Sequence, residues 1–464
     1  MGFVTYIFGG AMSEAVDSMG IRSAATAYPP RGVAWYAVFV LAFMYWVSIL
    51  DRFIISLLVD PIKRDLGITD VQFGMLSGLA FAVTFSLFGL VLGTLADRLS
   101  RRWVIFAGVS VWSLATAACG FAQQYWHLLL ARVGVGVGEA SLNPCAASML
   151  ADLFPRERLT NAMAVYGLGA TMGSGCAYFF GGVIVDLTSH TQTIVLPVIG
   201  AIRSWQAVFL IVGVPGMLLA WLILTVPEPI RRGLRKLDQT LSWRRSYADL
   251  LKFIGSRKRF FLCHYIAFAF AAAIVSGAGA WYPAHMGRTF GWSASQIGLG
   301  LGVTLTAAGL LGQLISGRIV DAMFRRGMRD AQFRWYASCL VIATPVGIVA
   351  TTSASPWVFL GCIGLFLIMI SALSACASTA LNLVTPNELR GTGIAFWAAT
   401  SGLVGAASGP VLIAMFAEKF FTGPSAIGHG LAMMMGICCP SAALFLALGF
   451  RAMREAVTEA ESWR

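Results

Sequence analysis

Twelve apolar stretches, each long enough to cross a lipid bilayer as a helix, dominate this chain. A helix needs about 20 predominantly apolar residues to span the hydrocarbon core. Only 12% of the residues are charged, against roughly 25% in a soluble domain, so a membrane rather than a large soluble core is predicted. The first six stretches lie at 33–58, 72–95, 103–122, 126–150, 160–186 and 205–226, and the second six at 260–284, 294–317, 334–352, 357–383, 391–416 and 431–450. The sequence therefore predicts an all-α, multi-pass membrane protein with twelve transmembrane helices.

A polar segment at 227–259 separates the two sets of six and carries ten Lys and Arg residues. The sets also repeat: GTLADRLSRR at 93–102 and GRIVDAMFRR at 317–326 share the pattern Gly-x3-Asp-x3-Arg-Arg, and both follow the second stretch of their set. A repeat at equivalent positions indicates two duplicated six-helix bundles. The predicted organisation is a tail at 1–32, a bundle at 33–226, a cytoplasmic basic linker at 227–259, a second bundle at 260–450 and a tail at 451–464.

The distribution of basic residues predicts the orientation, because cytoplasmic loops are enriched in Lys and Arg. If both termini are cytoplasmic, the outer loops hold five of the 33 basic residues, which are Lys63, Arg64, Arg203, Arg288 and Lys419. We therefore interpret the net charge of +12 as a topology signal and a contact with inner-leaflet lipids, not as a nucleic-acid-binding surface. The expected location is the plasma membrane, or the inner membrane if the source is a Gram-negative bacterium.

Four motifs carry a resemblance to a known family. The loop sequence GTLADRLSRR resembles the loop motif of the major facilitator superfamily, with Ser100 at a position where that motif normally has Gly. LDRF at 50–53, ARVGVGVGEAS at 131–141 and ADLFPRERL at 151–159 resemble the Spinster family of proton-linked lipid transporters within it. The resemblance implies two pseudo-symmetric bundles working by alternating access, with a lysophospholipid or sphingoid-type lipid as substrate.

Four charged side chains fall inside the predicted spans, away from the span ends: Asp51, Arg52, Arg132 and Glu139. A charge near the membrane centre costs about 2.5–3.5 kcal/mol on insertion scales, so it needs a partner or a function. Asp51 and Arg132 are predicted to lie at similar depth and to pair, because a helix rises about 1.5 Å per residue. Arg132 and Glu139 are seven residues apart and share one helix face.

These positions predict a proton-coupling site. A buried acid beside an arginine can be poised to titrate, because burial raises and a neighbouring cation lowers a carboxyl pKa. We expect Asp51 and Glu139 to bind the coupling protons. We expect Arg52 and Arg132 to hold an anionic head group or to restrain the acids. The alternative is a structural ion network that only fixes the registry of the helices.

Three alternating glycines, Gly134, Gly136 and Gly138, lie between Arg132 and Glu139. A dinucleotide-binding turn would need a further glycine where Glu139 stands, and no Gly-Lys-Ser/Thr follows, so neither nucleotide motif is present. Gly134 and Gly138 instead form a small-xxx-small pair, which lets another helix approach closely. We interpret them as packing residues that separate two functional charges.

No charge lies in the middle of a predicted span of the second bundle, so its contribution is expected to be apolar and aromatic. Phe396 and Trp397 of the eleventh span are predicted to face Tyr166 of the fifth across a cavity, with simple packing as the alternative. His264, at the inner start of the seventh span, is predicted to lie at the membrane interface rather than to relay protons.

The resemblance also implies an inner gate. In the superfamily's loop motif, an acid pairs with basic residues and with a helix N-terminus, and this holds the inner side shut. The matching residues are Gly93, Asp97, Arg98, Arg101 and Arg102, and a second copy consists of Asp321, Arg325 and Arg326. The alternative for the arginines is contact with the inner leaflet through their long side chains.

Together these features predict a proton-coupled secondary active transporter rather than an enzyme, since the sequence has no metal-ligand cluster and no serine elbow. A proton-coupled carrier of a small organic anion or drug is the alternative within the class. A membrane receptor or channel without coupled flux is the alternative from another class. No cofactor besides protons is expected, and the chain is expected to act as a monomer on a lipid or small amphipathic substrate.

Overall fold

The computed structural model describes residues 28–96, 99–189, 193–196, 200–231 and 243–462. Eleven helices in these ranges are long and apolar enough to cross a membrane. They are Arg31–Leu66, Asp70–Gly93, Arg101–Cys119, Asn161–Thr188, Ser204–Thr225, Lys258–Phe290, Ala294–Arg325, Ala331–Thr352, Pro356–Val384, Leu389–Phe420 and Ala426–Glu461. The predicted class, a multi-pass helical membrane protein, is confirmed.

The N-terminal half contains most of the elements that position the charged residues. In chain order they are α3 (Arg31–Ile54), η1 (Ile55–Leu58), α4 (Val59–Leu66), α5 (Asp70–Gly74), η2 (Met75–Ala80), α6 (Phe81–Ala96), α7 (Arg101–Cys119), α8 (Tyr125–Glu139), α9 (Leu142–Leu153), α10 (Arg156–Ser189), β1 (Thr193–Leu196), β2 (Gly200–Arg203), α11 (Ser204–Leu222) and η3 (Ile223–Thr225). The strands β1 and β2 pair antiparallel in a short hairpin that the sequence did not predict.

The C-terminal half follows after a linker helix. The linker helix is α12 (Trp243–Ser256). The elements of the half itself are α13 (Lys258–Phe290), α14 (Ala294–Arg325), α15 (Ala331–Thr352), α16 (Pro356–Ile370), α17 (Leu373–Val384), α18 (Asn387–Thr400), η4 (Ser401–Ala406), α19 (Ala407–Phe420) and α20 (Ala426–Glu461). The segment predicted as a tail from residue 451 is therefore mostly the end of α20. The predicted linker contains a helix, α12, whose buried Leu250 lies against Gly393 of α18.

The stretch predicted as one fourth span at 126–150 is instead two helices, α8 and α9, separated by Ala140 and Ser141. Pro144 lies in the first turn of α9. Since proline has no backbone N–H and its ring clashes with the carbonyl four residues earlier, a continuous helix through this point is disfavoured. The break follows Glu139 directly, so α8 ends at one of the predicted charged residues.

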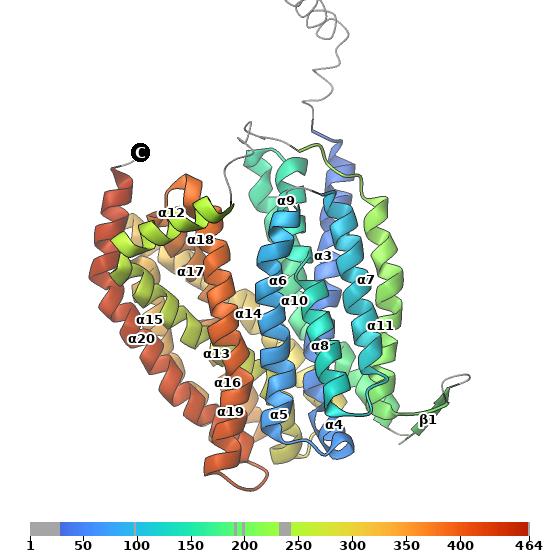
Figure 1. The fold of residues 1–464 in the computed structure, drawn as a ribbon. Helices are drawn as coiled ribbons and strands as arrows, with labels where there is room; N and C mark the ends of the chain where they lie inside the picture. The colour runs from blue at the N-terminus through green and yellow to red at the C-terminus, as the bar shows by residue number, and fades with distance from the viewer. Residues whose placement is uncertain (1–27, 97–98, 190–192, 197–199, 232–242, 463–464) are drawn as a thin grey trace, which may run out of the picture.

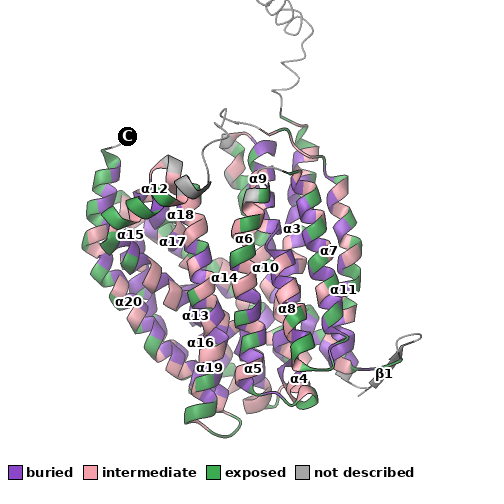
Figure 2. Ribbon diagram, in the orientation of Figure 1, coloured by how far each residue is buried: buried purple, intermediate pink, exposed green. Residues whose placement is uncertain are grey.

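The two halves lie side by side, with α3, α7 and α11 on one side of the molecule and α15 and α20 on the other (Figure 1). The start of α3, the end of α20 and α12 lie at one end, which we call the linker end. The hairpin β1–β2 and the segments α4 and α5 lie at the opposite end, the hairpin end. Exposed residues occur along helices throughout the molecule (Figure 2). They include large apolar side chains such as Leu218, Trp357 and Leu187, as expected for a surface that contacts lipid.

Backbone contacts between the halves are concentrated toward the hairpin end. A Cβ added at Gly74 would lie 2.9 Å from the Pro410 carbonyl oxygen, and one added at Gly78 would lie 2.8 Å from that of Ala407. The halves also contact each other between α14 and α10, where a Cβ added at Gly298 would clash with the backbone of Tyr178. Glycines nearer the linker end of the same helices, Gly89, Gly167, Gly317 and Gly391, have no such neighbour within 4 Å among the described residues. The halves therefore touch most closely at the hairpin end.

Candidate functional site

Glu139 and Arg52 form an ion pair inside the N-terminal half. Glu139, the last residue of α8, is 1% exposed, and its Oε2 accepts hydrogen bonds from Arg52 Nη2 at 2.6 Å and Ser48 Oγ at 2.8 Å. Both donors come from α3, where a spacing of four residues places them on one face. Arg52 keeps 26% of its side chain exposed, so it is a charged member of the cluster that solvent or a solute can reach.

Asp51 faces a different neighbour. Its side chain is 1% exposed, and its Oδ2 accepts a hydrogen bond from Thr116 Oγ1 of α7. The predicted ion pair between Asp51 and Arg132 does not form among the described residues. Successive residues of a helix point about 100° apart, so when Arg52 faces α8, Asp51 is turned toward α7. Asp51 and Arg132 do interact electrostatically, but the Asp51 side chain does not point in the predicted direction.

Arg132 is the most isolated of the four charges. It is 1% exposed, and none of its three guanidinium nitrogens has a hydrogen-bond partner within the described part of the chain. Its guanidinium carbon lies 5.4 Å from the centre of the Phe81 ring. Asp51 interacts electrostatically with Arg132, Arg52 and Glu139, so the two acids and two arginines form one electrostatic unit.

The phenylalanine that joins the two arginines was not predicted. Arg52 lies 4.6 Å from the centre of the Phe81 ring and 4.9 Å from that of Phe85. Arg132 also faces Phe81, so one aromatic ring contacts two guanidinium groups. A cation over an aromatic face gains roughly 0.5–2 kcal/mol, more when it is desolvated. Phe81 follows η2, a π-helical segment, and such segments often occur at functional sites.

The three glycines of α8 serve as packing residues, as predicted for two of them. A Cβ added at Gly138 would lie 2.5 Å from the backbone nitrogen of Trp112, and one at Gly134 would lie 3.0 Å from Ala115, both on α7. Gly136 faces the other way, where an added Cβ would lie 2.8 Å from the Phe81 carbonyl oxygen. Close approach on two sides holds α8 against α7 and α6, and this fixes Glu139 beside Arg52.

The candidate cavity aromatics are not brought together. Tyr166 is buried in the N-terminal half, where its hydroxyl donates to Asn143 Oδ1 at 2.6 Å and its ring stacks on Tyr45 at 5.0 Å. Trp397 is buried in the C-terminal half. Phe396 is partly exposed and contacts Tyr265. A shared cavity role for the three stays a prediction.

His264 is fully buried within the protein, and its position relative to the membrane interface stays a prediction. Its Nε2 lies 2.9 Å from the Ala377 carbonyl oxygen, and its ring packs against Phe268 at 4.7 Å and Trp397 at 6.1 Å. The helix α13 begins at Lys258, two residues before the predicted start of the span at 260, and it packs against α17 and α18.

Of the predicted inner gate, Asp97 and Arg98 lie outside the described residues, and Gly93 packs against Pro144 of its own half. Arg101 is buried and bridges two acids, with Nη1 at 2.5 Å from Asp152 and Nε at 2.9 Å from Glu228. The members of the second copy, Asp321, Arg325 and Arg326, are exposed and form no ion pair with another described residue.

Glu228 was not predicted, and it caps the start of α7. Its carboxylate accepts hydrogen bonds from the backbone N–H groups of Arg101 and Arg102 at 3.3 and 3.0 Å and from Ser100 Oγ at 2.7 Å. Burial alone would raise the pKa of Glu228, but the hydrogen bonds from Arg102, Arg101 and Ser100 outweigh burial and lower that pKa. Glu228, at the start of the linker, is therefore hydrogen-bonded to the N-terminus of α7.

We expect Glu228→Gln to lower the thermal unfolding midpoint at neutral pH and to flatten its dependence on acidification. A lowered pKa in the folded protein contributes stability above the unfolded value, about pH 4.3, that is lost as pH falls through the folded value. Unfolding followed in detergent between about pH 3 and 7 measures both effects. Glu455→Gln, which removes an exposed pair with Arg451, is the control and should change little. Equal acid slopes for Glu228→Gln and the parent would show that Glu228 contributes nothing.

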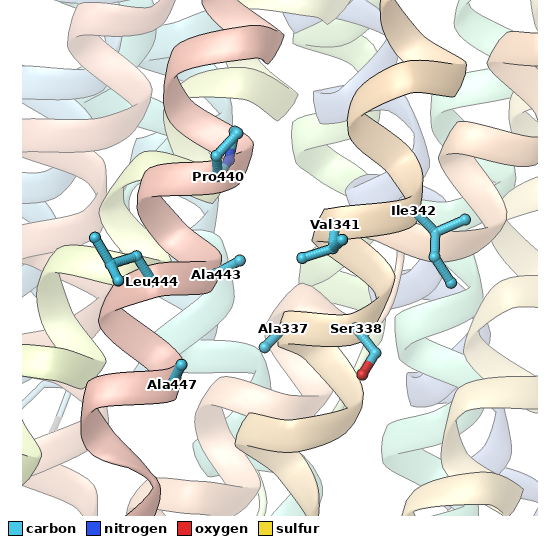
Figure 3. Close-up of a pocket in the computed structure, with 8 residues that line it drawn as sticks. All are labelled: Ala337, Ser338, Val341, Ile342, Pro440, Ala443, Leu444 and Ala447. Carbon is cyan, nitrogen blue, oxygen red and sulfur yellow. The ribbon is translucent and has the colours of Figure 1, made fainter.

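A groove of about 600 Å³ lies apart from these charges, between α15 and α20 (Figure 3). Its lining is apolar except for Ser338 and comprises Ala337, Ser338, Val341, Ile342, Pro440, Ala443, Leu444 and Ala447. Pro440 interrupts the hydrogen bonding of α20 at this level, which favours a local bend. Because the groove contains no charged group, we assign the candidate site to the cluster in the N-terminal half.

Comparisons with known proteins agree on one family. The family model described as Major Facilitator Superfamily matches residues 41–410. An "MFS-type efflux pump" of Mycolicibacterium smegmatis is 28% identical over 410 residues, which cover 87% of this chain and 89% of that protein. The sphingosine-1-phosphate transporter SPNS2 of Danio rerio is 26% identical over 406 residues, covering 82% and 75%. Protein spinster of Drosophila melanogaster is 28% identical over 251 residues, but this match covers only 53% of the chain and 38% of that protein.

Solved structures show the same fold. A bacterial homolog of the human lysosomal transporter Spinster, in an inward-facing and unoccupied conformation, superposes with a TM-score of 0.76 at 23% identity, covering 94% of this chain and 99% of that one. A D-xylose-proton symporter superposes with a TM-score of 0.67 at 16% identity, covering 89% and 97%. The resemblance to the Spinster family that the motifs indicated is confirmed.

Proposed function

The chain belongs to the major facilitator superfamily of membrane transporters, and from this membership and the buried charge cluster we propose that it is a proton-coupled secondary transporter. In this proposal the two halves alternate in exposing a shared site to the two sides of the membrane. Glu139 and Asp51 carry the coupling protons, and Arg52 and Arg132 recognise an anionic substrate. The observation that carries the proposal is the pairing of buried Glu139 with partly exposed Arg52.

The pairing suggests how a proton and an anion would be coupled. An ionised Glu139 holds the Arg52 guanidinium through a charge-assisted hydrogen bond. Protonation removes the negative charge, so Arg52 loses its counter-ion and becomes available to an anion that enters the site. Proton binding would then favour substrate binding, and the two equilibria are linked through one ion pair. Asp51, which interacts electrostatically with Glu139, would shift the same equilibrium.

The proposal includes a topology with twelve spans in two six-helix bundles. In it α8 and α9 together form the fourth span, although each alone is shorter than a bilayer requires, at 15 and 12 residues. The linker end is cytoplasmic, which places both termini and most of the basic residues on that side. The contacts between the halves at the hairpin end then correspond to a state closed to the outside and open to the cytoplasm.

The proposed substrate is a lysophospholipid or sphingoid-type lipid with an anionic head group. Two arginines in the N-terminal half supply cationic groups for such a head group, and the zebrafish relative is named a sphingosine-1-phosphate transporter. A small organic anion or drug is the second candidate. The Mycolicibacterium smegmatis relative, 89% of whose length the match covers, is named an efflux pump. Both candidates need the same cations, so the apolar part of the substrate distinguishes them.

Reconstitution into proteoliposomes tests the proposal. An imposed pH gradient should drive accumulation of one substrate class above its equilibrium level, with lysolipids, sphingoid phosphates and small aromatic anions compared under the same gradient. Collapse of the gradient with a protonophore should abolish the accumulation. Accumulation of the small anions alone would favour the second candidate. Flux that never exceeds equilibrium under any gradient would indicate a channel, and no flux with any substrate would contradict transport of these classes.

A further inference from the structure

Asp70 lies where the two halves meet at the hairpin end. It is the first residue of α5, which continues without interruption through η2 into α6. Arg288 of α13, in the other half, donates from Nη1 to Asp70 Oδ2 and from Nη2 to Asp70 Oδ1, both at 2.9 Å. The Arg288 Nε also donates to Asp60 Oδ1 at 2.9 Å, so one guanidinium bridges two acids of the N-terminal half. Lys63 adds a further contact to Asp70 at 2.5 Å.

A second contact crosses the halves at the same helix start. Glu418 of α19 accepts hydrogen bonds from the backbone N–H groups of Asp70 and Val71, at 2.7 and 3.2 Å. The first N–H groups of a helix have no partner within the helix, and a carboxylate near them is stabilised by the helix dipole. Thr69 caps only the third of these groups, that of Gln72. The amino terminus of α5 is therefore completed by an acid from the opposite half.

A third contact crosses the halves without any charge. Pro283 lies inside α13 and has no N–H to donate to the carbonyl oxygen of Gly279, four residues earlier. The Tyr178 hydroxyl of α10 donates to that oxygen at 2.5 Å. An added Cβ at Gly279 would lie 2.9 Å from the Phe53 ring, which shows how closely the halves approach there. A proline in one half thus frees a backbone acceptor that a hydroxyl of the other half binds.

We propose that Arg288, Glu418 and Tyr178 form a latch that holds the hairpin end shut and must be broken each time the protein opens on that side. The inference rests on the alternating access proposed above. All three contacts join one half to the other, and separation of the halves breaks them together. In the open state, water must replace the lost hydrogen-bond partners of three groups: the amino terminus of α5, the Gly279 carbonyl and the Arg288 guanidinium.

The latch differs from ordinary surface ion pairs in its burial. The Asp70 side chain is 11% exposed and that of Arg288 is 19% exposed, so their ion pair is little screened by solvent. Arg203 and Asp65 provide a contrast at the same end of the molecule. They lie 3.4 Å apart within one half, with side-chain exposures of 47% and 32%. Their pair should not respond to separation of the halves, which makes it a matched control.

Distance measurements between spin labels test the latch. Labels at Gln123 and Ala354 report on the hairpin end, and labels at Arg158 and Lys258 report on the linker end, since all four positions are exposed. Cys176 and Cys362, the partly exposed native cysteines, are replaced by Ser in the background. In Glu418→Gln or Arg288→Gln the ratio of open to closed hairpin end should rise about tenfold, because each change removes charge-assisted hydrogen bonds. The distance at the linker end should shorten in parallel.

Two further variants guard against misfolding as an explanation. Arg288→Lys keeps the charge but cannot bridge Asp60 and Asp70 in the same way, so an intermediate shift is expected. Tyr178→Phe leaves every charge in place and should shift the same ratio by a smaller factor. Arg203→Gln should leave both distances unchanged.

The outcomes separate the latch from the proposed function. In one outcome the parent exchanges between two populations, and Glu418→Gln, Arg288→Gln and Tyr178→Phe all have the same ratio of open to closed hairpin end as the parent. This outcome would overturn the latch and leave alternating access intact. A single fixed distance at both ends, in the parent and in every variant with and without a pH gradient, would overturn alternating access and the latch with it. A shift in Arg203→Gln as large as that in Arg288→Gln would also overturn the latch, because it would show that any charge lost at this end has the same effect.

Discussion

Glu139→Gln is expected to abolish pH-gradient-driven accumulation while the protein remains folded. Glutamine has nearly the same shape as glutamate, so contacts with Ser48 and Arg52 can be kept in part. What is lost is the group that ionises, together with the counter-charge that holds Arg52. A gradient of one pH unit supplies about 1.4 kcal/mol per proton, equivalent to a tenfold concentration ratio. The variant should lose about this factor for each proton that Glu139 carries.

Uptake by proteoliposomes with and without a gradient measures the effect, and exchange of substrate at equal pH on both sides serves as the internal comparison. Ser48→Ala is the matched control. It removes the neutral hydrogen bond to the same carboxylate oxygen but leaves the acid and Arg52 in place, so accumulation should persist. Undiminished gradient-driven accumulation in Glu139→Gln would exclude Glu139 from the coupling step.

The helical, membrane-spanning class could be predicted from the sequence because it depends on composition averaged over about 20 residues at a time. Local interruptions could not be predicted this way. Apolar content does not change at Ala140 and Ser141, yet α8 ends there, and Pro144 was the available signal for that break. The π-helical segments η2 and η4 also lie inside apolar runs. They depend on how two helices pack, and nothing in a hydropathy pattern indicates them.

In the charged cluster, too, features of a single helix could be predicted from the sequence, whereas features that depend on how helices pack could not. Four charges inside apolar runs identified the candidate site residues, because a charge in a membrane needs an explanation. Depth along each helix followed from a constant rise per residue. The rotation of each helix about its axis did not, and rotation decides that Arg52 rather than Asp51 faces α8. A depth argument alone therefore chose the wrong pair.

Uncharged partners were harder still to foresee. Phe81 is one of 31 phenylalanines in the chain, and nothing in its neighbourhood marks it as the ring that contacts both arginines. Thr116 and Ser48 lie inside apolar helices, as many other hydroxyl residues do. The sequence shows Pro283 and Pro410, and each proline leaves one backbone carbonyl oxygen without its helical donor. The sequence does not show which side chain donates to that oxygen instead. For Pro283 that partner is Tyr178 of the opposite half, and for Pro410 it is Ser276, which donates to the Ala406 carbonyl oxygen.

Asp51→Asn is expected to remove most of the pH dependence of the conformational equilibrium. Asp51 is buried, receives a hydrogen bond from Thr116, and interacts electrostatically with Glu139, Arg132 and Arg52. Asparagine fixes the uncharged state, so the cluster keeps one excess positive charge at every pH at which Glu139 is ionised. If one proton on Asp51 is linked to opening, the parent's population ratio changes up to about tenfold per pH unit near its midpoint. In the variant it should change less than about twofold.

The populations at the hairpin and linker ends, measured by the same label pairs across about pH 4.5 to 8, give the ratio directly. Thr116→Val keeps the acid and removes only its hydrogen-bond donor, so the midpoint should move while the steepness remains. Arg132→Ala should act through longer-range electrostatics, since the structure joins Asp51 to Thr116 rather than to Arg132, and its effect should be smaller than that of Asp51→Asn. Combining Asp51→Asn with Glu139→Gln should add less than the sum of the two, as interacting groups do. If Asp51→Asn follows pH as steeply as the parent, Asp51 is only a structural acid, and Glu139 with Arg52 must carry the whole response.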